Sequence, residues 1–201
     1  MMQKQTLVLA HGAGAPMDSD WLNNITNKLE LNNIEVIRFE FPYMEKRRIT
    51  GKKSPPDKLP ILVDKFNNIV NSLNKPVFIA GKSMGGRIAS MIAPTNNNIL
   101  GVIAYGYPFH PVGKPEKLRT EHLKKYNKPM LIIQGENDPF GKSKEWENFN
   151  IDKSIEIFPI SKANHDLKPN KSTGLSLDEA MNIAVKKTAS FIKKNQINSS
   201  L

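Results

Sequence analysis

The chain has 201 residues, of which 39% are hydrophobic and 24% charged, and its formal net charge is +10. This length can bury a sizeable core in one domain, and the composition is typical of a soluble globular protein. The sequence contains no cysteine, which excludes disulfides and thiolate metal sites. The apolar run at residues 7–10 is too short for a signal-peptide core, and no run approaches the ~20 apolar residues of a membrane span. We therefore expect a cytoplasmic protein.

Short apolar runs alternate along the chain with segments of helical periodicity. This alternation predicts βα units built on a parallel sheet. The predicted strands are residues 6–10, 34–39, 77–80, 99–104, 130–134 and 155–158. Helices with one apolar face are predicted at residues 21–29, 59–73, 84–92 and 177–192. The last helix opens with the capping box Ser176–Glu179, and its predicted buried side includes Ile183.

Two long segments carry few signals of regular structure. Residues 41–57 contain prolines at positions 42, 55 and 56 and are predicted to form a polar loop. Residues 105–129 follow the fourth strand, with a short helix expected around residues 116–125. A second short helix is expected near Glu145. Because both long segments follow strands of a parallel sheet, they leave its carboxyl edge, where sites form in such sheets.

The sequence Gly81-Lys82-Ser83-Met84-Gly85 separates the third strand from an amphipathic helix. It matches the pattern G-x-S-x-G, which places a serine hydroxyl at the tip of a sharp strand-to-helix turn. The flanking glycines are expected because a Cβ atom there would collide as the strand turns into the helix, and Gly86 because the helix packs closely. Lys82 and Arg87 are expected to be solvated, although Arg87 could instead meet an anion near the start of the helix.

A serine needs a base to become a nucleophile, usually a histidine that a carboxylate holds in one tautomer. Asp138 follows the fifth strand, and His165 follows the sixth. Both therefore lie beyond the carboxyl ends of strands and in the chain order serine, acid, histidine. The sequence predicts Ser83, Asp138 and His165 as a catalytic triad.

The other candidates for acid and base fit this order less well, namely His11, His110, His122, Glu136, Asp152 and Asp166. His110 precedes the acid in the chain but could line a pocket. His11 and His122 fit packing or surface roles, and Asp166 adjoins the histidine and points elsewhere. Glu136 and Asp152 stay open as alternatives for the acid.

An oxyanion needs backbone N–H donors that are already in place. One is expected from Met84, the residue after the serine, and the second from the loop after the first strand. Ala13 is the first choice there and Gly14 the second, because a loop with small side chains can approach a substrate closely. The alternative, that these small residues only form a turn, stays open.

These motifs resemble the α/β-hydrolase superfamily over nearly the whole chain, through residues 11–14, the serine turn, the Asp138 loop and His165. Segments 41–44, 81–86, 106–111, 113–119, 134–135 and 138–141 are similar to a small dienelactone-hydrolase-like branch of predicted bacterial hydrolases. That branch is related to eukaryotic proteins resembling a histone-acetyltransferase-complex subunit and to testis-expressed hydrolase-like proteins. Dienelactone hydrolases proper use a cysteine nucleophile, so that particular activity is not expected here.

The resemblance implies a minimal α/β-hydrolase fold. This is a three-layer α/β/α sandwich around a mainly parallel six-stranded sheet of order 2-1-3-4-5-6, without a large cap. It also implies a serine hydrolase that needs no metal and no organic cofactor. We expect one α/β domain over residues 1–201, with residues 105–128 as a candidate small lid.

Basic and aromatic residues cluster in the two long segments at the predicted catalytic edge. The basic ones are Lys46, Arg47, Arg48, Lys52, Lys53, Lys114, Lys117, Arg119, Lys124 and Lys125. A positive rim would concentrate anionic substrates, but a lysine-rich chain can also carry such loops merely solvated. Five residues are candidates for contact with a substrate: His11, Tyr43, Tyr107, Phe109 and His110.

The sequence as a whole favours a carboxylesterase-like or thioesterase-like enzyme acting on a small molecule, with a small anionic ester as one option. The alternative is a catalytically silent binding or scaffold protein of the same fold. The high net charge alone gives no support to nucleic-acid binding, because no recognition motif accompanies it. No membrane partner is expected, and the oligomeric state is open between monomer and homodimer.

Overall fold

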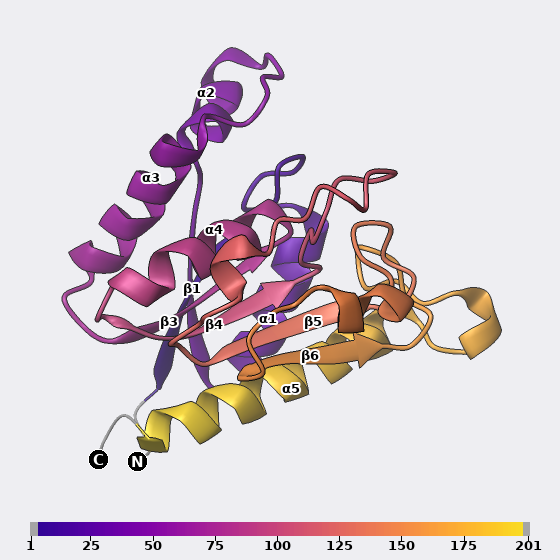
Figure 1. Cartoon of the computed structure of the whole chain (residues 1–201). Coiled ribbons are helices and arrows are strands. Elements are labelled where there is room, and N and C mark those ends of the chain that lie inside the picture. Colours follow the sequence, from indigo (N-terminus) through magenta and orange to yellow (C-terminus); the bar gives the residue numbers. More distant parts are fainter. Residues whose placement is uncertain (1–3, 199–201) are drawn as a thin grey trace.

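The computed structural model describes residues 4–198, and a six-stranded sheet lies at its centre (Figure 1). The strands are β1 (Gln5–Ala10), β2 (Ile34–Phe39), β3 (Val77–Lys82), β4 (Ile99–Tyr105), β5 (Met130–Gly135) and β6 (Ile155–Ile160). Their order is β2-β1-β3-β4-β5-β6, which confirms the predicted order. Every neighbouring pair is parallel, so the sheet is more uniform than the mainly parallel one expected.

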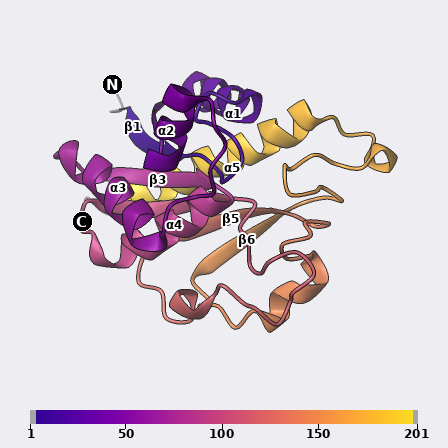
Figure 2. The ribbon, with the colours of Figure 1, turned by 90° about the horizontal axis from the view of Figure 1, so that it is seen from above.

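Four helices cover the two faces of the sheet (Figure 2). α1 (Asp20–Leu31) and α5 (Leu177–Asn198) pack on one face, and α3 (Leu59–Ser72) and α4 (Met84–Ile92) on the other. Because successive side chains of a strand point to opposite faces, Val8 and Ala10 pack with the second pair of helices, whereas Leu7 and Leu9 pack with the first. Within residues 4–198, no helix is long and apolar enough to cross a bilayer.

Strand β3 positions the serine turn. All six of its residues are buried, and it lies between β1 and β4 in the middle of the sheet. The strand ends at Lys82 and α4 begins at Met84, so Ser83 alone makes the turn. Its φ of 51° and ψ of −113° are a strained conformation for a residue with a side chain. The serine is therefore held at the carboxyl edge of the sheet by a fully buried central strand.

The glycines around the serine are required by close backbone contacts, as the sequence predicts. A Cβ atom on Gly81 would lie 2.2 Å from the carbonyl carbon of Gly85. A Cβ atom on Gly85 would lie 2.6 Å from the carbonyl oxygen of His11, and one on Gly86 would lie 2.8 Å from the Cβ atom of Ala104. Strand, turn and helix can come this close only because these side chains are absent.

The prediction of a polar loop at residues 41–57 is wrong, because helix α2 (Pro42–Thr50) occupies most of this segment. Pro42 suits the first turn of a helix, and Gly51 ends the helix in the left-handed conformation with a φ of 68°. Tyr43 and Met44 are buried against the body of the protein. Their burial stabilises a helix that the sequence does not indicate, since four of its nine residues are charged.

The short connections form 3-10 turns rather than longer helices: η1 (Ala93–Thr95), η2 (Glu121–Leu123), η3 (Ser143–Asn148) and η4 (Lys171–Thr173). The helix expected around residues 116–125 is thus reduced to η2, and the one expected near Glu145 is η3. The capping box at Ser176 is present, since its Oγ accepts a hydrogen bond from the Glu179 N–H at 3.2 Å. The predicted burial of Ile183 is wrong, because this residue is 37% exposed.

We predict that Gly81→Ala destabilises the protein by about 3 kcal/mol or more, or prevents folding, because its Cβ atom would meet backbone that cannot move aside. Gly14→Ala is the matched control: its Cβ atom would find no atom within 4 Å, and we expect a change below about 1 kcal/mol. Urea unfolding followed by circular dichroism measures both values. Equal unfolding midpoints for the two variants would contradict the steric argument.

Candidate active site

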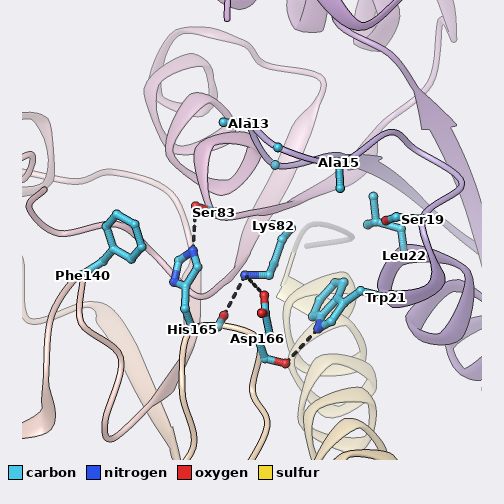
Figure 3. Close-up of a pocket in the computed structure, with 12 residues that line it drawn as sticks. Ala13, Ala15, Ser19, Trp21, Leu22, Lys82, Ser83, Phe140, His165 and Asp166 are labelled. Atoms are coloured by element: carbon cyan, nitrogen blue, oxygen red, sulfur yellow. Dashed lines mark hydrogen bonds and ion pairs between the residues drawn. The ribbon is translucent and has the colours of Figure 1, made fainter. Parts of the chain in front are cut away.

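Ser83, His165 and Asp138 form a continuous series of hydrogen bonds at the carboxyl edge of the sheet. Figure 3 shows the first of these contacts, between Ser83 and His165. His165 Nδ1 lies 2.7 Å from Oδ2 of Asp138, and His165 Nε2 lies 2.9 Å from Oγ of Ser83. An ionised carboxylate can only accept, so Nδ1 donates to Asp138 and Nε2 is left to accept from the serine hydroxyl. This tautomer is the one that can take a proton from Ser83.

Asp138 is held rigidly in the loop that leaves β5. Its side chain has an exposed fraction of 0%, and its second oxygen, Oδ1, accepts a hydrogen bond from the Phe140 N–H at 2.9 Å. The side chain of Gln134, at the end of β5, donates to Oδ2 at 2.8 Å and to the carbonyl oxygen of Tyr107 at 3.1 Å. The carboxylate therefore has a fixed direction before it meets His165.

The alternative acids are engaged elsewhere. Glu136 Oε2 accepts a hydrogen bond from the N–H of Lys162 at 2.8 Å. Asp152 Oδ1 caps the turn into β6 by accepting from Ser154 N–H at 2.9 Å. The structure thus brings Asp138, rather than Glu136 or Asp152, to His165.

A cavity of about 320 Å³ opens beside Ser83 and His165. Its walls come from five parts of the chain, and Figure 3 shows them around the opening. They are residues 12–15 after β1, the start of α1 with Ser19, Trp21 and Leu22, the turn residues Lys82 and Ser83, and Phe140, His165 and Asp166. The surface of the cavity is largely apolar, and the Ser83 hydroxyl and the His165 imidazole form part of its wall. The cavity therefore suits a small, partly apolar ligand.

The candidate oxyanion donors lie where the loop after β1 meets the start of α4. Ala13 and Gly14 line the cavity, and Met84 is the first residue of α4, whose first-turn N–H groups have no partner within the helix. The Ala13 carbonyl accepts from the Tyr43 hydroxyl at 3.0 Å, and the Gly14 carbonyl accepts from Arg47 at 3.3 Å. Contacts from α2 therefore hold these two carbonyls and fix the loop.

None of the five residues expected to contact a substrate lines this cavity, namely His11, Tyr43, Tyr107, Phe109 and His110. All five are buried. His11 Nε2 accepts from the N–H of Phe41 at 3.0 Å while Nδ1 donates to the Gly12 carbonyl at 2.7 Å, and burial lowers its pKa. His11 and Tyr43 thus support the loop after β1 instead of facing a ligand, which corrects the expectation.

The other three support the segment that leaves β4. The ring of Phe109 stacks on Phe149 with a centroid distance of 4.2 Å. His110 Nε2 lies 2.9 Å from a carboxylate oxygen of Glu145. The hydroxyl of Tyr107 donates to a backbone carbonyl of the following loop at 2.9 Å. Tertiary contacts made far along the chain decide these roles, so residue type and loop position were insufficient to assign them.

Lys82 is buried with an exposed fraction of 8%, which overturns the expectation that it is solvated. Its Nζ donates to the carbonyl oxygen of His165 at 2.7 Å and lies 3.2 Å from Oδ1 of Asp166. The same group lies 5.6 Å from the ring centroid of Trp21, whose indole N–H donates to the Asp166 carbonyl at 2.9 Å (Figure 3). Burial lowers the pKa of Lys82, and the Asp166 carboxylate opposes this shift.

Lys82 and Trp21 together tie the loop that carries His165 to β3 and to α1. We call this set of contacts, made by Lys82, Trp21, His165 and Asp166, the latch. No local pattern indicates the latch, because a lysine within G-x-S-x-G is expected to be a surface residue. Gln134 was missed as well, although its position at the end of β5, four residues before Asp138, could have suggested a partner for that acid.

We predict that Lys82→Met loosens the latch, because the variant keeps the unbranched stem but removes a charge-assisted hydrogen bond. Losing a bond of this kind should speed amide hydrogen exchange in residues 161–168 by about tenfold or more. Exchange followed by mass spectrometry measures the change. Lys168→Met, an exposed lysine of the same loop, is the control. If the amides of residues 161–168 exchange at the same rate in both variants, Lys82 does not hold this loop in place.

His122 forms a second polar contact beneath η2. Its Nε2 lies 2.8 Å from the Ser90 hydroxyl, and burial, together with the nearby charge of Arg87, lowers its pKa to about 4. This agrees with the structural role that the sequence suggested. The imidazole is neutral at pH 7 in the folded protein.

We predict that His122 makes the folded protein less stable as the pH falls from 7 toward 4. The unfolded chain takes up a proton near pH 6.5, whereas folded His122 takes it up only near pH 4, so acid favours unfolding. His122→Gln should therefore lose about 2 kcal/mol less between pH 7 and pH 4.5 than the parent. Urea unfolding at the two pH values measures the difference, and equal losses would contradict the assignment.

Comparison with known proteins agrees with this architecture. Residues 3–193 match the family model described as an alpha/beta hydrolase domain. The dienelactone hydrolase of Anabaena variabilis superposes with a TM-score of 0.73 at 17% identity, covering 95% of this chain and 86% of that chain. An alpha-beta serine hydrolase homologue from Coxiella burnetii gives 0.70 at 18% identity, covering 92% and 85%.

The monoacylglycerol lipase of Paleococcus ferrophilus gives a TM-score of 0.69 at 15% identity, covering 92% of this chain and 94% of that chain. The high coverage on both sides means that no large cap separates this chain from its structural neighbours. Identities this low establish the common fold and leave the substrate to be argued from the site.

Proposed function

The chain belongs to the alpha/beta hydrolase domain family, and from that premise we propose that it is a serine hydrolase cleaving an ester or thioester of a small molecule through an acyl-enzyme. The observation that carries the proposal is the unbroken series of hydrogen bonds from Ser83 to His165 to Asp138. A protein that only used the fold as a scaffold would gain nothing from this arrangement beside an open cavity. Neighbours of the same fold that are named as esterases and lipases support the reaction class.

In the proposed reaction, Oγ of Ser83 attacks the ester carbonyl carbon while Nε2 of His165 takes the hydroxyl proton. Asp138 holds the imidazole in the required tautomer and stabilises the imidazolium that forms. The negative charge that develops on the carbonyl oxygen is received by the N–H of Met84 and by that of Ala13 or Gly14. His165 then protonates the leaving group, and a water molecule, deprotonated by the same imidazole, releases the acyl group from Ser83.

The strained conformation of Ser83 supports the same proposal. A positive φ at a residue with a side chain persists only where surrounding structure enforces it, and such strain gathers at functional sites. Here it turns the hydroxyl away from the sheet toward His165 and the cavity. The cavity of about 320 Å³ favours a short acyl chain or a compact leaving group over a long lipid chain.

We predict that a fluorophosphonate probe labels the parent protein at Ser83 and leaves Ser83→Ala unlabelled. His165→Gln should slow labelling by about 100-fold or more, because the base that activates the serine is lost. Ser19→Ala, which removes another serine of the same cavity, is the matched control and should still be labelled. Mass spectrometry of the intact protein and of its peptides reads the result. Equal labelling of the parent and Ser83→Ala would refute the assignment of the nucleophile.

A further inference from the structure

Arg87 lies on α4, one helical turn beyond Ser83, and its N–H donates to the Ser83 carbonyl at 3.1 Å. Side chains of a helix tilt toward its N-terminus, so the arginine stem leans back toward the serine turn. The Nε atom of Arg87 is buried and has no hydrogen-bond partner within residues 4–198. A buried guanidinium donor without a partner is uncommon and calls for an explanation.

A second arginine lies close to the first. Arg119 belongs to the segment that leaves β4, and its backbone is fixed there because its N–H donates to the Phe109 carbonyl at 2.7 Å. Burial lowers the pKa of Arg119, and the charge of the neighbouring Arg87 guanidinium lowers it further. Among the described residues, neither arginine takes part in an ion pair.

The surroundings provide no counter-charge for this pair. Burial and the nearby charge of Arg87 lower the pKa of His122 to about 4, so its imidazole is neutral at pH 7. Two carboxylates lie near Arg119 along the chain: Glu121 lies 2.6 Å from Lys124, and Glu116 forms no ion pair with either arginine among the described residues. Two like charges thus share a partly desolvated place in the described part of the chain.

Holding two cations together away from bulk water is costly unless an anion joins them. The planar guanidinium of arginine presents parallel N–H donors that match the oxygens of a carboxylate or a phosphate. Arg87 comes from the helix that follows Ser83, and Arg119 from a loop at the same edge of the sheet. Neither arginine lines the cavity described above, so a ligand held by both would extend from Ser83 along the first turn of α4 toward the segment after β4.

We propose that Arg87 and Arg119 bind a carboxylate or phosphate group of the substrate whose ester bond is cleaved at Ser83. The inference rests on the proposed function and narrows it to anionic acyl esters. Binding by these two arginines differs from the long-range attraction of anions by the basic residues of the two long segments, because it depends on two specific side chains. The rim lysines act at long range and are screened by salt, whereas a desolvated arginine pair is screened much less.

The first test compares three 4-nitrophenyl esters of similar length at constant ionic strength: the neutral hexanoate, the mono-ester of adipate and the 5-phosphonopentanoate. We expect the ratio of kcat/KM for an anionic ester to that for the neutral one to fall about 10- to 100-fold in Arg87→Gln and in Arg119→Gln. A variant that is partly misfolded loses activity toward both esters equally, so this ratio does not respond to general damage to the fold. The two anionic esters distinguish carboxylate from phosphate as the natural group.

Lys153→Gln removes one charge at the opposite edge of the sheet, in the turn before β6, and should leave the ratio unchanged. The proposal is overturned if either arginine variant changes the ratio no more than this control does. If Arg87→Gln fails to fold, Arg119→Gln, at a half-buried loop position, still decides the question.

Calorimetry on Ser83→Ala, with adipate and inorganic phosphate as probes, tests the site without turnover. Binding of one probe that is weakened tenfold or more by adding Arg119→Gln supports the arginine pair, even if no ester proves to be a substrate. Binding that is equal with and without Arg119→Gln, or no binding of either probe, refutes it. Failure of the fluorophosphonate label would instead refute the proposed hydrolase, so the two failures are distinguishable.

Discussion

The close backbone contact between Gly81 and Gly85 is the constraint on which the rest of the site depends. It allows a fully buried central strand to pass into a helix through one residue, and it forces that residue, Ser83, into a conformation with a positive φ. Because the sheet is entirely parallel, the loops after β1, β5 and β6 all arrive at the same edge. They bring the small residues 12–15, Asp138 and His165 around one hydroxyl without any long insertion.

The features that could be predicted from the sequence are those that depend on residues close together along the chain. The alternation of apolar runs with helical periodicity predicted the six strands, and G-x-S-x-G predicted the turn at Ser83. The chain order of serine, acid and histidine predicted Asp138 and His165, whereas the order of the strands in the sheet was implied by the resemblance to the α/β-hydrolase superfamily. The errors concern residues whose environment is made by distant parts of the chain. Lys82 is buried because Trp21, His165 and Asp166 meet it, and α2 forms because Tyr43 and Met44 find a core to enter. Neither condition has a local signature.

Charge near the serine is organised differently on its two sides. On the side of α1, the ammonium of Lys82 is neutralised by Asp166 and covered by an indole ring, so that the cavity wall has little net charge. On the side of α4 and the segment after β4, Arg87 and Arg119 keep their charges unpaired within the described residues. An ester held between these sides would place an apolar part toward the first and an anionic part toward the second.

The three groups of the proposed triad are anchored to the fold with very different strength. Ser83 directly follows the central strand, and Asp138 is fixed by Gln134 at the end of a second buried strand. His165 stands on a surface loop secured by the latch. A loop of this kind can open at a free-energy cost well below that of unfolding the sheet. Heat should therefore displace the imidazole first, and the protein should become inactive at temperatures where its secondary structure is still complete.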